Sequence, residues 1–102
     1  MMTNKEMIAA TGEEYMLRQM AEECCELAQA ALKLVRAQNA ETPVSVGKAR
    51  QKLVEELADT KIMFNIVYSL LSDSELSDYD AVLKYKKERF AKRIRAKQNP
   101  AT

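Results

Sequence analysis

The sequence contains no histidine and no tryptophan among its 102 residues. Without histidine, these residues cannot supply an imidazole acid or base, a Ser-His-Asp triad or a His-containing zinc site. The Glu-x-x-His pairs of di-iron helical bundles are excluded for the same reason. Any chemistry performed by this chain therefore depends on other side chains.

Glycine and proline are also scarce, with two of each, and no stretch alternates Val, Ile and Thr with polar residues. Both features favour helices over strands, so we expect an all-α fold. The length suits a single domain spanning residues 1–102. A compact domain of this size buries only a little over ~60% of its unfolded surface, which favours additional burial through oligomerisation.

The charges nearly cancel, because 16 Lys and Arg residues face 15 Asp and Glu residues, for a net charge of +1. This balance gives no general reason to expect nucleic acid or a membrane surface as partner. The sequence shows no secretory leader and no apolar run of about 18 residues, so we expect a soluble, cytoplasmic protein without a membrane partner. Cys24 and Cys25 are adjacent, and helical geometry separates their side chains by about 100°, which predicts reduced thiols.

Capping signals and apolar spacing predict where the first helices lie. A short helix is expected over residues 3–10, capped by Thr3. A long helix then runs to Gln38 from a capping box formed by Thr11 and Glu14. Its apolar stripe recurs at steps of three and four residues. The stripe consists of Met16, Met20, Cys24, Leu27, Ala31 and Leu34.

The second half of the chain predicts two more helices. Pro43 interrupts the chain, and Ser45 caps a helix over residues 46–72. The apolar stripe of that helix consists of Leu53, Leu57, Thr60, Phe64, Val67 and Leu71. The last helix is expected over residues 78–97, with Ser77 and Asp80 spaced as a capping box.

Clustered carboxylates lie beside the apolar stripes of both long helices. Glu23 and Glu26 are three residues apart on the first helix, as are Glu56 and Asp59 on the second, and such spacing brings like charges onto neighbouring turns. At about 100° per residue, Glu23 and Glu26 lie about 40° and 100° from Leu27. On the second helix, Glu56 lies at the margin of the apolar stripe and Asp59 lies a step beyond. If the helices pack antiparallel, four hard oxygen donors can converge, which suits Mg²⁺ or Mn²⁺. The alternative is that these acids are ordinary solvated helix residues.

The stretches EECCELAQAALK and VEELADTKIMF resemble the EExxE and ExxD signature of the MazG-like, all-α nucleoside triphosphate pyrophosphohydrolases, over about residues 13–96. The resemblance implies Mg²⁺-dependent cleavage of nucleoside triphosphates between the α- and β-phosphates, releasing nucleoside monophosphate and pyrophosphate. It implies metal binding by the two carboxylate pairs described above. It also implies that Glu22 or Glu55 supports the site or orients the attacking water.

Half of the basic residues fall within KYKKERFAKRIRAK, residues 84–97, which resembles the last helix of the same family. Lys87, Arg89 and Arg93 are the residues expected to contact substrate phosphates. The alternative is a solvated basic face near a helix C-terminus, where cations suit the helix dipole. Nucleic-acid binding by this helix has no aromatic or motif support.

Residues 62–71, IMFNIVYSLL, are apolar around nearly the whole helix and must be covered on more than one side. We expect a helical bundle of two long antiparallel helices plus shorter helices, completed to a four-helix core by dimerisation. The resemblance likewise implies a homodimer or a tetramer made of dimers. A functional alternative from another class is a non-catalytic helical interaction module with structural carboxylates.

Overall fold

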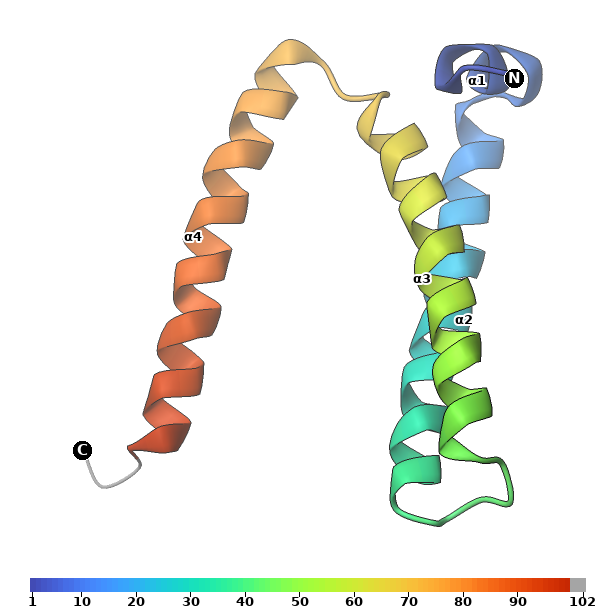
Figure 1. Cartoon of the computed structure of the whole chain (residues 1–102). Coiled ribbons are helices and arrows are strands. Elements are labelled where there is room, and N and C mark those ends of the chain that lie inside the picture. The colour runs from blue at the N-terminus through green and yellow to red at the C-terminus, as the bar shows by residue number, and fades with distance from the viewer. Residues whose placement is uncertain (100–102) are drawn as a thin grey trace. The chain divides into compact units, whose positions relative to one another are not determined.

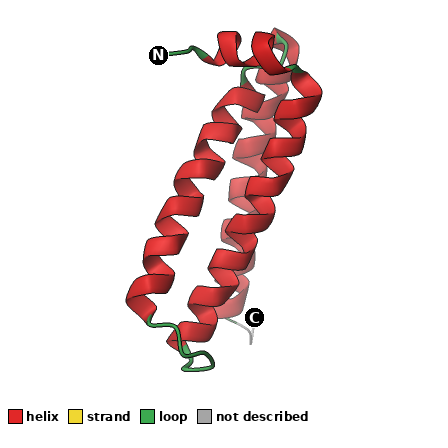
Figure 2. Ribbon diagram, turned by 90° about the vertical axis from the view of Figure 1, so that its right-hand side faces the viewer, coloured by secondary structure: helices red, strands yellow, loops and turns green. Residues whose placement is uncertain are grey.

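The computed structural model describes residues 1–99, and within them it contains four helices and no strand (Figures 1 and 2). The expected all-α class is thereby confirmed. The helices are α1 (Asn4–Thr11), α2 (Glu13–Gln38), α3 (Val46–Tyr68) and α4 (Asp73–Gln98). The chain divides into two compact units, Met1–Leu70 and the segment that starts at Leu71.

Helices α2 and α3 form an antiparallel pair, joined by the loop of residues 39–45 (Figure 1). Two apolar clusters hold the pair together at its opposite ends. One consists of Met16, Met63 and Ile66, and the other of Leu34, Ala37 and Ala49. The beginning of each long helix therefore packs against the end of the other.

Helix α1 adds to the first cluster, because Met7 and Ile8 pack against it. Gly12 joins α1 to α2 with φ at 96°, a left-handed conformation that favours glycine. The capping box predicted at Thr11 is wrong. Thr11 is the last residue of α1, and its Oγ1 donates a hydrogen bond of 2.8 Å to the carbonyl oxygen of Met7.

The seam of α2 follows steps of three and four residues, as predicted, but it is rotated from the expected stripe. Cys24 and Ala31 are exposed, whereas Ala30 and Ala37 are buried. Small side chains at these positions let the two helix backbones approach closely. The seam of α2 consists of Met16, Met20, Glu23, Leu27, Ala30, Leu34 and Ala37.

The seam of α3 differs from the predicted stripe in a way that matters for the acids. Leu57 is 51% exposed, whereas Glu56 is only 2% exposed. Glu56 therefore lies at the centre of the seam, and its expected place at the margin is wrong. Ala49, Leu53, Thr60, Met63 and Ile66 are the other seam residues that are buried or partly buried.

Two predicted helix caps are confirmed, because the side chains of Thr3 and Ser45 each accept a backbone hydrogen bond at a helix start. The last helix begins earlier than predicted, and α3 ends at Tyr68. The capping box at the start of α4 is formed by Ser72 and Glu75, not by Ser77 and Asp80. The earlier box satisfies two backbone donors, and the helix starts five residues sooner than predicted.

Most side chains of α4 are exposed, and the structure assigns this helix to the second compact unit. Among residues 1–99, no helix combines the length and the apolar character needed to cross a bilayer.

Candidate metal centre

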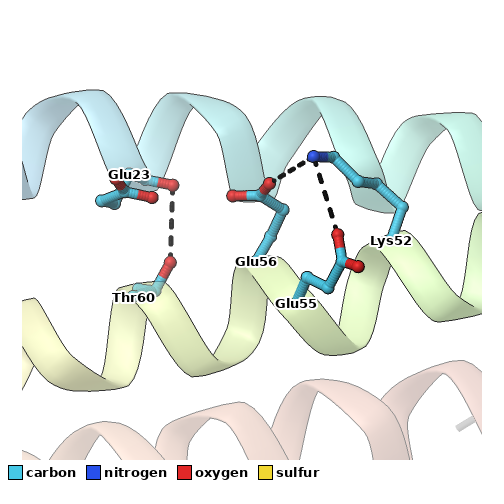
Figure 3. Close-up of polar contacts among 5 residues, drawn as sticks. All are labelled: Glu23, Lys52, Glu55, Glu56 and Thr60. Carbon is cyan, nitrogen blue, oxygen red and sulfur yellow. Dashed lines mark hydrogen bonds and ion pairs between the residues drawn. The ribbon is translucent and has the colours of Figure 1, made fainter.

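Three carboxylates from the two long helices meet across the α2–α3 seam. Each of Glu23, Glu56 and Asp59 offers one oxygen atom, and these atoms lie within 4.8 Å of one another. Figure 3 shows the side chain of Glu56 between Glu23 on one side and Lys52 on the other. Of the four predicted ligands, Glu23 of α2 and Glu56 of α3 lie in the seam between the two helices.

Two of the carboxylate oxygens in this cluster are buried without a partner. Neither Oε2 of Glu23 nor Oε2 of Glu56 has a hydrogen bond from any residue that the structure describes. A buried polar atom without a partner destabilises the fold, and the cost is larger when the atom carries charge. Glu56 is only 2% exposed, so water does not solvate its carboxylate.

Burial and neighbouring charges both act on the carboxyl group of Glu23. The pKa of Glu23 is raised, mainly by burial and then by the charges of Glu26, Asp59 and Glu56. A raised pKa means that the surroundings disfavour the carboxylate form. A proton or a cation in the cluster would relieve this repulsion.

One ammonium group partly offsets the acids. Lys52 Nζ lies 2.9 Å from Glu56 Oε1 and 3.9 Å from Glu55 Oε2. The hydrogen bond from Lys52 to Glu56 and the negative charge of Glu56 raise the pKa of Lys52. Lys52 was not among the predicted site residues. A lysine four residues before a glutamate on a helix is nevertheless a recognisable pairing signal.

Thr60 forms a hydrogen bond between α3 and α2 beside the acids. Its Oγ1 donates a hydrogen bond of 3.4 Å to the backbone carbonyl oxygen of Glu23 (Figure 3). The sequence analysis placed Thr60 in the apolar stripe but gave it no polar role. This long bond joins α3 to the backbone of α2 next to the acids.

A pocket of about 200 Å³ opens next to the carboxylates and carries groups of both charges. Its lining residues are Glu26, Gln29, Ala30, Lys33, Lys52 and Glu56. Acids on one part of the wall suit a cation, and the two lysines suit an anion. The pocket therefore offers groups of both charges to a ligand.

The donor set fits a hard divalent cation. Mg²⁺ and Mn²⁺ prefer carboxylate and water oxygens, and the cluster supplies carboxylates from two helices. The unpartnered oxygens of Glu23 and Glu56 are available to such a cation. Cys24 and Cys25 are free, exposed thiols outside this cluster, so the soft ligands do not contribute.

The remaining predicted site residues lie at different places. Glu26 is exposed but lines the pocket, and Glu55 is exposed beside Lys52. Glu22 is exposed on α2, outside the three-residue cluster.

Lys87, Arg89 and Arg93, the residues predicted to contact phosphate, are exposed on α4. The guanidinium carbon of Arg93 lies 5.5 Å from the centre of the Phe90 ring. Since α4 belongs to the second unit, a role for these three residues at the acidic cluster stays a prediction.

Comparison of the chain with protein-family models, curated proteins and solved structures finds no match. The resemblance carried by EECCE and ELAD thus remains an expectation from sequence.

Proposed function

We propose that this protein is a Mg²⁺-dependent nucleoside triphosphate pyrophosphohydrolase, which releases nucleoside monophosphate and pyrophosphate. The observation that carries the proposal is the pair of buried, unpartnered oxygens on Glu23 and Glu56, close to Asp59. Mn²⁺ is the expected substitute for Mg²⁺ because both prefer oxygen ligands.

The chain's own residues divide into holding and orienting groups. Glu23, Glu56 and Asp59 would hold the cation, joined by Glu26 from the neighbouring turn of α2. When bound, the ion would neutralise triphosphate charge and lower the pKa of a bound water. Glu22 or Glu55 would support the site or orient the attacking water, and no covalent nucleophile is required.

The lysines near the acids support an anionic substrate. Lys33 and Lys52 line the same pocket as Glu26 and Glu56, so phosphate oxygens entering there would meet cations as well as the metal. Lys87, Arg89 and Arg93 would supply further contacts to the phosphates. A homodimer, or a tetramer made of dimers, is the expected assembly.

A second candidate function is a non-catalytic helical interaction module whose carboxylates are structural. The ion pair between Lys52 and Glu56 favours this second candidate, because Glu56 already pairs with a cationic side chain of the same helix. This candidate predicts a folded protein that hydrolyses no triphosphate, with or without a bound cation.

Phosphorus NMR on a panel of nucleoside triphosphates, with and without Mg²⁺, tests the proposed reaction. The expected first products are pyrophosphate and nucleoside monophosphate, and their formation requires Mg²⁺. Release of single phosphates would contradict the proposed cleavage site. Asp59→Asn should remove the activity, whereas the matched control Asp78→Asn, at an exposed position of α4, should retain it.

A further inference from the structure

Lys52 and Glu56 form a pair whose two members differ sharply in exposure. The side chain of Lys52 is 58% exposed, whereas that of Glu56 is 3% exposed. Lysine keeps its charged end near water on a flexible stem, so it can move at little cost. Glu56 is enclosed by the seam and has no comparable freedom.

The ammonium of Lys52 occupies one side of Glu56, and the acidic cluster occupies the other. Oε1 of Glu56 accepts the 2.9 Å contact from Lys52, while Oε2 is buried without a partner in the described chain. A divalent cation bound by Glu56 would lie a few ångströms from this ammonium. Like charges at such short range repel strongly in a partly desolvated site, so the two cations compete for Glu56.

A second acid provides the place to which the ammonium can move. Glu55 Oε2 already lies 3.9 Å from Lys52 Nζ, and its side chain is 60% exposed. A small rotation of the lysine stem would exchange the buried partner, Glu56, for the exposed partner, Glu55. The exchange keeps the ammonium paired and leaves both oxygens of Glu56 to the cation.

We propose that Lys52 is an exchangeable counter-ion, which holds Glu56 while no divalent cation is bound and moves to Glu55 when one binds. Lys52 thus stabilises the cation-free fold and weakens the affinity of the site for the cation. The inference rests on the proposed cation site, but it does not depend on the proposed hydrolysis.

Mn²⁺ binding to the whole protein tests this role directly. Electron paramagnetic resonance of free Mn²⁺ gives the dissociation constant, and melting temperatures are recorded with and without the ion. Lys52→Met removes the charge but keeps a good helix former. Lys52→Gln also removes the charge, yet its amide can still donate to Glu56 and so protects the fold. Lys52→Arg keeps the charge, and Lys48→Met is the matched control on the same helix.

Both neutral variants should bind Mn²⁺ more tightly, by about tenfold or more, because a competing charge has been removed. Lys52→Met should also melt at a lower temperature than the unmutated protein when no cation is present. Lys52→Arg and Lys48→Met should bind Mn²⁺ as the unmutated protein does.

Equal or weaker binding by Lys52→Met and Lys52→Gln would overturn the inference while leaving the cation site intact. Tighter binding by Lys52→Arg would show that charge is not the cause, and would overturn it as well. If the unmutated protein binds no Mn²⁺, the cation site itself is wrong. If Mn²⁺ binds as described but triphosphates are not hydrolysed, the counter-ion role stands and the proposed reaction fails.

Discussion

Glu23 of α2 and Glu56 of α3 lie across the helix seam from each other, and each has a buried Oε2 without a partner among the described residues. Apolar clusters hold the seam together on both sides of these acids. The hydrophobic contacts therefore keep the two carboxylates close, although their charges repel. Such a conflict between local stability and charge is characteristic of functional sites.

The first prediction is that Mg²⁺ or Mn²⁺ stabilises the protein. A cation that binds only the folded state adds about 2.7 kcal/mol at a concentration of 100 times its dissociation constant. Calorimetry should show a melting temperature that rises across millimolar Mg²⁺. Glu26→Gln and Asp59→Asn should each abolish most of this rise. If the melting temperature of the unmutated protein does not change with Mg²⁺, the proposed cation site is wrong.

The second prediction is that Glu23→Gln stabilises the cation-free protein. The pKa of Glu23 is raised in the folded state, so folding is penalised when this carboxylate is charged. That penalty is full above the raised pKa and disappears as the pH falls from there to the ordinary value of 4.5. The unmutated protein should thus gain stability relative to Glu23→Gln as the pH falls through this window.

Denaturant unfolding of both proteins at a series of pH values, with a chelator present, measures this difference. The same substitution should remove the Mg²⁺-dependent rise in melting temperature. A Glu23→Gln protein that is less stable than the unmutated one at neutral pH, without metal, would contradict the assigned repulsion.

The third prediction concerns the rate of triphosphate hydrolysis. Replacing any one of Glu23, Glu26, Glu56 and Asp59 by its amide should cost on the order of 10² or more in rate, because each would help hold the ion that stabilises transition-state charge. Steady-state pyrophosphate release at saturating Mg²⁺ is the measurement. Glu13→Gln, at an exposed position in the first turn of α2, is the control and should keep the full rate.

The sequence predicted the all-α class correctly, but it did not predict which face of α3 is buried. Hydrophobic periodicity puts Leu57 near the centre of that face. The structure shows that a charged residue, Glu56, occupies that position. A buried acid cannot be recognised from hydrophobic periodicity, because periodicity treats every carboxylate as a surface group.

The role of Lys52 was missed for a different reason. Its pairing with Glu56 has the i, i+4 spacing of many solvated surface pairs. Only the three-dimensional structure shows that one member is buried and that its other oxygen lacks a partner. The hydrogen bond from Thr60 to Glu23 joins residues 37 positions apart, so sequence spacing gave no signal for it.

The fourth prediction concerns the capping box of α4. Ser72→Ala should destabilise this helix by about 1 kcal/mol, since the hydroxyl satisfies a backbone donor at its start. Hydrogen bonds from Ser72 lower the pKa of Glu75, so the contribution of Glu75 is present above its ordinary pKa and is lost as the pH falls through the lowered value. Circular dichroism during denaturation, at neutral and acidic pH, measures both effects.

Ser77→Ala is the control for that experiment, because Ser77 lies inside α4 and not at its start. Alanine is the better helix former, so this variant should be neutral or slightly stabilising. A larger loss of stability for Ser77→Ala than for Ser72→Ala would instead put the start of the helix at Ser77, as the sequence predicted.

The expected oligomer needs a different test from the one that the sequence alone suggests. Asp substitutions of Ile66 or Leu70 are expected from sequence to cause unfolding or aggregation. Ile66 is 2% exposed and belongs to the cluster between α2 and α3, so Ile66→Asp would disrupt the helix pair whether or not chains associate. Exposed apolar residues of α3 are better probes, and they include Val54, Leu57 and Ile62.

The last prediction is therefore that the protein is at least a dimer and that Leu57→Asp fails to give a stable, active monomer. Leu57 is 51% exposed, and a second chain covering this face would bury apolar surface that monomers rarely leave open. Light scattering behind size exclusion, at low micromolar concentration, should give a mass well above 11.6 kDa. Lys48→Asp also adds an acid near the start of α3 and should leave the assembly intact. A folded species of 11.6 kDa would contradict the expected oligomer.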